Sequence, residues 1–266
     1  MTRFDQAVTA TEIQELSSQQ TLHKVMVSDD YSVNKVPNGG YLMALLAHQM
    51  LERSDKNTTP IITVNFLAKA IIAPADIYIK EISRSRQFNR YEARLVQEGK
   101  EILHGIGSFM ADDLDCVLNR YEEQVAVIAP LEDCISFPQM PDFTIYDNMD
   151  VRLEPESAPW LNGEKGTKSE HRGWIRFRDD RPFDICGILL AADTFPPAIF
   201  ATEGPTGWVP TIEMSINIRN LPRSRWLKCR FRTRHVTCGL LEEDGELWDE
   251  AGNLVAISRQ IAQFRP

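Results

Sequence analysis

The sequence predicts an α+β fold of two tandem units, each a curled antiparallel sheet around a buried central helix. Three observations lead to this prediction. Two short helical segments are apolar on nearly every face, each is followed by four strand-like segments, and the two sets lie about 150 residues apart. A helix that is hydrophobic all round must be buried on all sides. A sheet that curls around the helix would bury it in this way.

Length and composition are those of an ordinary globular protein. The 266 residues are 43% hydrophobic and 25% charged, with a net charge of −9, which fits one large domain or two of about 130 residues. The negative charge and the lack of a basic tract argue against nucleic-acid binding. No apolar run approaches the roughly 18 residues that span a bilayer, and residues 1–6 do not start a signal peptide. We expect a cytoplasmic protein that binds neither nucleic acid nor membrane.

Cysteine and histidine spacing indicates neither a metal centre nor a disulfide framework. The five cysteines form no CxxC pair and the five histidines form no HExxH motif. An odd number of scattered thiols is typical of a reducing compartment. We expect no metal, no cofactor, and reduced, mostly buried cysteines.

The first half of the chain reads as a strand, a buried helix and four further strands. A polar leader with a short helix over residues 10–16 precedes a strand over 21–27. The turn Pro37-Asn38-Gly39-Gly40 opens an apolar helix that runs from Tyr41 to Leu51. The four strands that follow are expected over 61–73, 76–86, 91–97 and 102–110.

Acidic clusters and three prolines interrupt the pattern in the middle of the chain. We expect a linker over 113–143 that crosses the surface between an N-terminal unit, 1–112, and a C-terminal unit, 144–266. The second unit repeats the first, with a strand over 143–153, a loop over 154–169 and a strand over 171–178. A buried helix follows from Gly187, and the last four strands are expected over 209–219, 225–236, 239–248 and 254–264.

Landmarks in the two halves keep a nearly constant offset. Gly40 and Gly187, which open the apolar helices, are 147 apart, and Pro74 and Pro222 are 148 apart. Thr63 and Thr211 are also 148 apart, while the glycines of the final hairpins, Gly99 and Gly252, are 153 apart. The sequence therefore predicts a duplicated unit. Two such units can pair their sheet edges and cover unpaired backbone groups.

One carboxylate, Asp193, lies in the most apolar stretch of the chain, residues 186–200. Pro196 should end the helix at about Phe195, which puts Asp193 in the last helical turn, where the helix dipole opposes a negative charge. Burial of an ionised carboxylate is costly unless the group is paired or hydrogen-bonded. Asp193 is therefore either a buried residue with ordinary structural partners or a functional group.

Three segments of the second half resemble the double-hotdog acyl-CoA thioesterases of the type II family: Ala-Ala-Asp193-Thr-Phe-Pro-Pro, Val-Pro-Thr211-Ile-Glu-Met-Ser and Val-Ala-Ile-Ser-Arg-Gln260. The resemblance covers nearly the whole chain. It implies hydrolysis of a fatty-acyl-CoA to free acid and CoA, with Asp193, Thr211 and Gln260 orienting the water. Pro196, Pro197 and Glu213 depart from the best-studied branch, which leaves the acyl-chain preference open.

The residue chemistry agrees with this resemblance. A carboxylate in an apolar pocket has a raised pKa and becomes a better base near neutrality. A hydroxyl and a primary amide both donate and accept hydrogen bonds, so Thr211 and Gln260 can hold a water. The backbone N–H groups at Asn38, Gly39 and Gly40 are candidate donors to the thioester carbonyl. The alternative for Asn38 is a plain helix N-cap.

The duplication predicts a single active site. At the same offsets, the first-half equivalents of Asp193, Thr211 and Gln260 are Leu46, Thr63 and Gly107, and two of these three lack the chemistry. Two other classes remain as alternatives: a non-catalytic acyl-CoA-binding module, and a hydratase or dehydratase on the same fold. No His lies near Asp193 in the sequence to form the hydratase pair. Exposed sheet edges make a homodimer an expectation.

Overall fold

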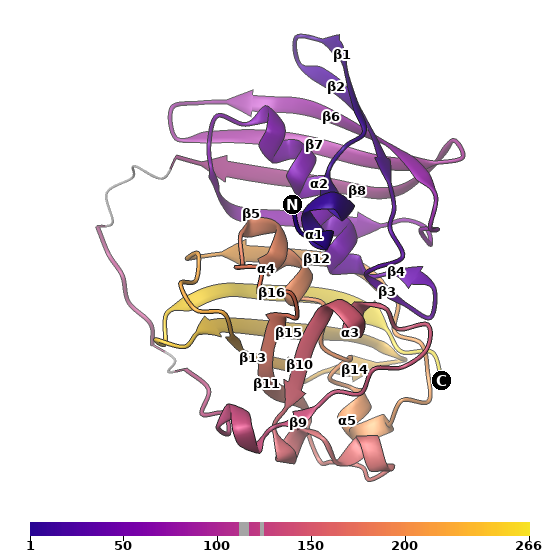
Figure 1. The fold of residues 1–266 in the computed structure, drawn as a ribbon, viewed down its shortest axis with the longest axis vertical. Coiled ribbons are helices and arrows are strands. Elements are labelled where there is room, and N and C mark those ends of the chain that lie inside the picture. Colours follow the sequence, from indigo (N-terminus) through magenta and orange to yellow (C-terminus); the bar gives the residue numbers. More distant parts are fainter. Residues whose placement is uncertain (112–116, 123–124) are drawn as a thin grey trace.

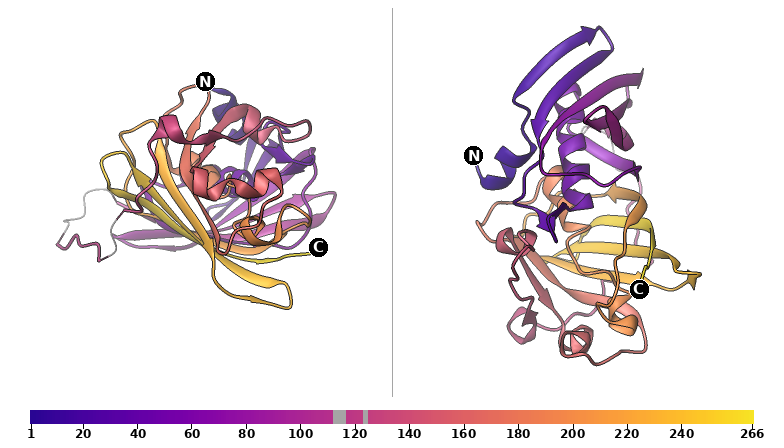
Figure 2. Two further views of the ribbon diagram at one scale, coloured as in Figure 1. Left: turned by 90° about the horizontal axis from the view of Figure 1, so that it is seen from below. Right: turned by 90° about the vertical axis from the view of Figure 1, so that its right-hand side faces the viewer.

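The computed structural model describes residues 1–111, 117–122 and 125–266, and one 14-stranded antiparallel sheet runs through it. Figure 1 shows the first unit, in indigo to magenta, stacked on the second, in crimson to yellow. The sheet curls around the helices at its centre (Figure 2). The first unit contains α1 (Arg3–Val8), β1 (Glu12–Ser17), β2 (Gln20–Met26), β3 (Ser32–Val33), β4 (Val36–Pro37), α2 (Gly39–Arg53), β5 (Thr58–Phe66), β6 (Pro74–Arg84), β7 (Phe88–Gln97) and β8 (Lys100–Met110).

The second unit repeats this arrangement with a few additions. It contains β9 (Ile135–Ser136), α3 (Ile145–Asn148), β10 (Met149–Leu153), β11 (Ser169–Phe177), α4 (Ile185–Ala191), α5 (Phe200–Glu203), β12 (Thr211–Ile218), β13 (Leu227–Thr233), β14 (Val236–Thr237), β15 (Leu240–Asp249) and β16 (Leu254–Gln263). Short 3-10 turns at Leu131–Asp133, Pro155–Ser157 and Pro159–Asn162 complete the elements.

Strand order confirms the duplication. The first unit runs β2-β6-β7-β8-β5 and the second runs β11-β13-β15-β16-β12 in the same sense from its edge. The two units meet where β5 pairs antiparallel with β12, with Ile62 opposite Ile216 and Val64 opposite Met214. The predicted pairing of unit edges is therefore confirmed, and it removes two open edges from the fold.

The two central helices are buried as their composition predicts. All residues from Gly40 to Ala47 of α2 are buried, and so are all seven residues of α4. Both helices begin with a side-chain cap: the Asn38 side chain accepts from the backbone N–H of Tyr41, and the Asp184 side chain accepts from that of Gly187. The helices also pack against each other, which brings the two units together at the level of the helices as well as of the sheet.

The strand register corrects the predicted equivalence of Thr63 and Thr211. Ile62 lies opposite Gly107, and Met214 lies opposite Gln260, so Met214 corresponds to Ile62. By the same step Thr211 corresponds to Thr59, which lies three residues before Ile62 as Thr211 lies three residues before Met214, and both strands have a bulge there. The connections between helix and strand differ in length between the units, so the offset carried over from the helices places the equivalent of Thr211 four residues too far along the strand, at Thr63 instead of Thr59.

The helix caps shift the remaining equivalence by one residue. Asp193 lies nine residues after the cap Asp184, and the same step from Asn38 leads to Ala47 rather than to the predicted Leu46. Both residues are apolar and completely buried. The conclusion drawn from the repeat is therefore unchanged, since the carboxylate has no counterpart in the first unit.

The N-terminal segment differs from the prediction. The helix lies over Arg3–Val8, and residues 10–16, which were predicted as helical, instead form most of strand β1. A capping box starts α1: the Thr2 backbone donates to the Asp5 carboxylate and the Asp5 backbone donates to the Thr2 hydroxyl. Strand β1 is an edge strand of a hairpin with β2, and its residues are exposed.

Two other segments differ from their predicted extent. The strand predicted over 143–153 begins with the helical turn α3 before β10, and the strand predicted over 61–73 ends at Phe66. Residues 112–116 and 123–124, all but the first of them in the predicted linker over 113–143, lie outside the described residues. The last part of the linker contains β9, which pairs with β10. The unit boundaries at 112 and 144 stay a prediction.

The close approach of α2 and α4 depends on Gly40. A Cβ at Gly40 would lie 2.6 Å from the Leu189 carbonyl oxygen and 2.8 Å from Asp193 Cβ. Backbone cannot move aside as a side-chain tip can, so we expect Gly40→Ala to lower the free energy of unfolding by about 1–3 kcal/mol. Urea denaturation measures this loss.

The control for that variant is Gly187→Ala in α4. The nearest atoms to a Cβ there belong to the side chains of Phe177, Arg181 and Asp184, and alanine favours the helix by about 1 kcal/mol. Gly187→Ala should therefore change stability by less than about 1 kcal/mol. Equal losses in the two variants would contradict the proposed role of the helix contact.

Candidate active site

Asp193 lies directly after α4, at the contact between the two units. The helix ends at Ala191, and the backbone N–H of Asp193 donates to the Leu190 carbonyl in a final turn. The residue is thus two positions past the helix rather than in its last turn as predicted. Pro196 and Pro197 follow and prevent continuation of the helix. Asp193 keeps an intermediate exposure although its neighbours Ala192 and Thr194 are buried.

The carboxylate of Asp193 is held by the N-terminus of α2 from the other unit. Its Oδ2 accepts hydrogen bonds from the Gly40 backbone N–H at 2.9 Å and from Asn38 Nδ2 at 3.0 Å. Asn38 Nδ2 also donates to the Asp193 carbonyl at 2.7 Å. The start of a 15-residue helix carries a partial positive charge that stabilises an anion. Each unit therefore supplies one half of this contact.

Gly39 and Gly40 make that contact sterically feasible. A Cβ at Gly39 would lie 2.9 Å from Asp193 Oδ2, so a larger residue would push the carboxylate from the helix terminus. The backbone N–H groups of Gly39 and Gly40, predicted as donors to a thioester carbonyl, thus have Asp193 as their partner in this structure. The prediction for the Asn38 backbone N–H is wrong, because it donates to the Tyr31 carbonyl, and the contact of Asn38 with Asp193 is made by its side chain. Asn38 is also the N-cap of α2, because its Oδ1 accepts from the Tyr41 N–H.

Burial dominates the proton affinity of Asp193. It raises the pKa from 3.8 to about 6, while the hydrogen bonds from Gly40, Asn38 and Gly39 act in the opposite direction. The carboxylate is therefore mostly ionised at pH 7, yet far more basic than an exposed aspartate. That combination suits a general base that works near neutral pH.

Thr211 and Gln260, the other two predicted residues, are hydrogen-bonded to each other. The Thr211 hydroxyl donates to Gln260 Oε1 at 2.7 Å across strands β12 and β16. A β-bulge between Thr211 and Glu213 explains how Thr211 reaches this position. Met214, Ile216 and Ile218 point inward at every second residue, and strict alternation would turn Thr211 outward. The extra residue in the bulge reverses this and re-aims the side chain.

Glu243 on β15 completes this second group and was not predicted. Its Oε1 accepts from Gln260 Nε2 at 2.9 Å, and its Oε2 accepts from the Ala198 backbone N–H at 2.6 Å. Only 5% of the residue is exposed. Burial raises its pKa to about 7, and the nearby charge of Asp193 contributes to the rise. The alternation of β15, with Leu241 and Leu247 inward, would have identified Glu243 as an inward carboxylate.

The predicted residues thus form two groups. Asp193 binds Asn38 and Gly40, whereas Thr211 binds Gln260, which binds Glu243. Within the described ranges no direct hydrogen bond joins the two groups. They are coupled electrostatically, since the charge on Asp193 acts on Glu243.

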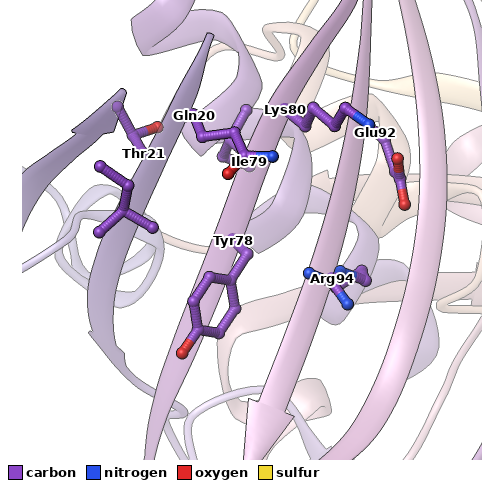
Figure 3. Close-up of a pocket in the computed structure, with 8 residues that line it drawn as sticks. Gln20, Thr21, Tyr78, Ile79, Lys80, Glu92 and Arg94 are labelled. Carbon is purple, nitrogen blue, oxygen red and sulfur yellow. The ribbon is translucent and has the colours of Figure 1, made fainter. Parts of the chain in front are cut away.

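Two hollows lie elsewhere in the part of the chain that the structure describes, and neither is lined by Asp193, Thr211 or Gln260. The cavity in Figure 3 has a volume of about 40 Å³ and lies on β2, β6 and β7, with Tyr78, Lys80 and Arg94 in its wall. Substrate pockets usually exceed about 300 Å³. A second hollow, of about 410 Å³, reaches this size, but none of its lining residues is a predicted site residue; they are Arg3, Tyr31, Asp147, Asn148, Arg178 and Asp179. No group of three or more potential metal ligands occurs among the described residues. In the same part of the chain, none of the helices has the length and apolar character needed to cross a membrane.

Comparison with known proteins gives this architecture a family. Residues 27–110 match the acyl-CoA thioesterase N-terminal domain and residues 131–264 match the acyl-CoA thioesterase C-terminal domain. Together the two matches cover most of the chain. The chain therefore belongs to the acyl-CoA thioesterase family, a class of thioester hydrolases with the double-hotdog fold.

Solved structures agree with this assignment. A candidate thioesterase II of Thermobifida fusca is 28% identical, with a TM-score of 0.87 over 100% of this chain and 98% of that one. The acyl-CoA thioesterase II TesB2 of Mycobacterium marinum is 17% identical, with a TM-score of 0.75 over 98% of each chain, and shows the shared fold. An uncharacterized protein of Mycobacterium tuberculosis is 33% identical over 89 residues, 34% of this chain and 30% of that protein. The chain thus matches less than a third of the length of that curated relative.

The raised pKa of Asp193 predicts a stability gain on its neutralisation. Above about pH 6 the folded protein holds an ionised carboxylate that is less favourable there than in the unfolded chain, whose pKa is 3.8. Below pH 3.8 the group is neutral in both states and the difference disappears. We expect Asp193→Asn to raise the free energy of unfolding at pH 8 by up to about 3 kcal/mol.

Urea denaturation of both proteins at pH 8 and at pH 3.5 measures this effect. The gain should shrink toward zero at the lower pH. A variant that is less stable than the wild type at pH 8 would show that the α2 terminus stabilises the charge more than burial opposes it.

Proposed function

We propose that the protein hydrolyses fatty-acyl-CoA thioesters to free acid and CoA, with Asp193 as the general base. The observation that carries the proposal is the carboxylate of Asp193 at the N-terminus of α2, with a pKa raised to about 6. Family membership supports the substrate class. Thr211 and Gln260 lie in the same region as a hydrogen-bonded pair that can position the hydrolytic water.

In the proposed reaction, Asp193 removes a proton from water while the water oxygen attacks the thioester carbonyl carbon. The tetrahedral intermediate collapses by cleavage of the C–S bond. The proton held by Asp193 then passes to the departing sulfur, so that the products are a carboxylic acid and the free thiol of CoA. One water is consumed and Asp193 returns to its ionised state.

The side-chain amide of Asn38 and the backbone N–H groups of Gly39 and Gly40 also contribute to the proposed reaction. They bind the Asp193 carboxylate before the reaction. As Asp193 takes up the proton, negative charge leaves the carboxylate and develops on the thioester oxygen. The positive end of α2 stabilises charge at either position. We therefore propose that these donors stabilise the negative charge on the thioester oxygen during the reaction.

Two other functions differ from this proposal in what they require. A hydratase or dehydratase of this fold would need a histidine beside Asp193. The hydrogen-bond partners of Asp193 among the described residues are Asn38, Gly39, Gly40 and its own helix. A non-catalytic acyl-CoA-binding module would bind the thioester but leave it intact. The second alternative is decided by the assay below.

Release of free thiol from acyl-CoAs of short to long chain tests the activity. Asp193→Asn should lower kcat by roughly two orders of magnitude, the usual effect of losing a general base. Thr211→Val should lower kcat by about tenfold or more, because the isosteric side chain no longer contacts Gln260 or the water. An enzyme-only sample corrects for the protein's own cysteines.

The matched control is Thr63→Val on β5. The Thr63 hydroxyl bonds to Ser215 at the junction of the two units and to no predicted site residue, so its loss should leave kcat within about twofold. Bound but unhydrolysed acyl-CoA at every chain length would replace the thioesterase proposal with the binding module.

The activity should also fall as the pH is lowered through the acid range. Asp193 must be ionised to accept a proton, and its pKa is about 6. We expect kcat/KM to fall as the pH drops through about 6, whereas an exposed aspartate would move this fall to about pH 4. A pH profile from 4.5 to 8.5 locates it, and a plateau that extends to pH 4.5 would exclude Asp193 as the base.

A further inference from the structure

Glu243 is a buried carboxyl group that the reaction described above does not use. It is 5% exposed, and its oxygens accept one hydrogen bond each, from Gln260 Nε2 and from the Ala198 backbone. Burial without a cation costs free energy. The ladder partner of Glu243 is Gln260, so the two polar side chains face each other directly across β15 and β16.

The first unit shows that the fold does not need this pair. Gly107, the equivalent of Gln260, lies opposite Tyr91 on β7. Tyr91 is completely buried, and the Met50 sulfur occupies the space above Gly107. An aromatic ring and a thioether thus fill the first unit where the second has a carboxylate and an amide. The polar pair belongs to the unit that contains Asp193, which points to a role in the site.

The contacts of Glu243 set the direction of every hydrogen bond toward Thr211. An ionised carboxylate only accepts, so the NH₂ group of Gln260 faces Glu243. The carbonyl Oε1 of Gln260 then faces Thr211 and accepts from its hydroxyl. Thr211 has a single proton and gives it to Gln260. Its oxygen is left with lone pairs alone, so it can only accept from any further partner.

We propose that Glu243 is a positioning residue that acts through Gln260 and Thr211 to orient the hydrolytic water. The inference rests on the proposed thioesterase function. With Thr211 restricted to accepting, a water between Thr211 and Asp193 gives one O–H to each of them. Both protons of the water are then bound, and its lone pair is left for the thioester carbon. The water is held in the orientation that attack requires.

A change of Glu243 to glutamine tests this direction with almost no change in shape. The new amide must place an NH₂ group against one of two donors, the Ala198 N–H or the NH₂ of Gln260. If Gln260 turns over to relieve the conflict, its NH₂ group faces Thr211 and the hydroxyl can donate elsewhere. We expect Glu243→Gln to lower kcat by about 10- to 100-fold with KM changed by less than threefold.

The exchange of the two residues, Glu243→Gln together with Gln260→Glu, is the matched control. The amide on β15 would accept from the Ala198 N–H and donate to the carboxylate on β16, which would again accept from Thr211. The hydrogen bonds from the Ala198 N–H and from the Thr211 hydroxyl keep their direction, whereas the bond between the two exchanged side chains reverses and the charge moves to the neighbouring strand. We expect the double variant to recover at least tenfold of the loss in kcat seen in the single variant.

The pH profile separates positioning from a purely structural role. The carboxylates near Glu243 are Asp193 at the end of α4 and Asp244 on its own strand, and Asp244 is paired with Arg259. With pKa values of about 7 for Glu243 and about 6 for Asp193, the acid limb of the wild type should contain two ionisations. Glu243→Gln should leave one, at lower pH, because a negative charge near Asp193 is gone.

The outcomes are distinct. If the wild type hydrolyses acyl-CoA and Glu243→Gln has the same kcat and the same acid limb of the pH profile, the positioning role is overturned and the thioesterase proposal stays intact. A lower kcat that tracks a lower free energy of unfolding, without recovery in the double variant, also overturns it. If the single variant does not fold, the folded double variant decides by its kcat, which must lie within about tenfold of the wild type. Absence of wild-type turnover on every acyl-CoA overturns both proposals.

Discussion

The contact between the Asp193 carboxylate and the N-terminus of α2 is the interaction on which the rest of the site depends. It joins the end of one central helix to the start of the other, and it is only possible because Gly39 and Gly40 bring no side chain into the gap. Burial raises the pKa of the carboxyl group and the helix terminus lowers it. The balance leaves an ionised but basic group near neutral pH.

The two units contribute differently to this arrangement. The first supplies donors from the start of α2, and the second supplies Asp193 together with the Thr211, Gln260 and Glu243 group. The continuous sheet through β5 and β12 keeps these parts at fixed positions. A rigid scaffold of this kind suits hydrolysis, where small errors in the position of a water lower the rate.

The sequence was sufficient for the fold because the apolar character of residues 40–47 and 185–191 leaves few ways to bury them. It also identified Asp193, Thr211 and Gln260 as candidates through their resemblance to the family. It could not show that Asn38 contacts Asp193, since that contact depends on how two distant helices cross. The offset of Thr211 was wrong because connection lengths between helix and strand vary freely. Glu243 was missed although its inward position follows from simple alternation.

The duplication implies a position equivalent to the site at the start of α4. The residues at that position differ from those at the start of α2. The cap Asp184 is bound by Arg181, which also binds Asp5 of α1, while the counterpart of Asp193 is Ala47. The space that a second site would occupy is used to anchor the N-terminal helix. A carboxylate restored at Ala47 would face Asp184 instead of neutral amide donors. The two copies therefore differ at more than one residue, and no single substitution would give the molecule two equivalent active sites.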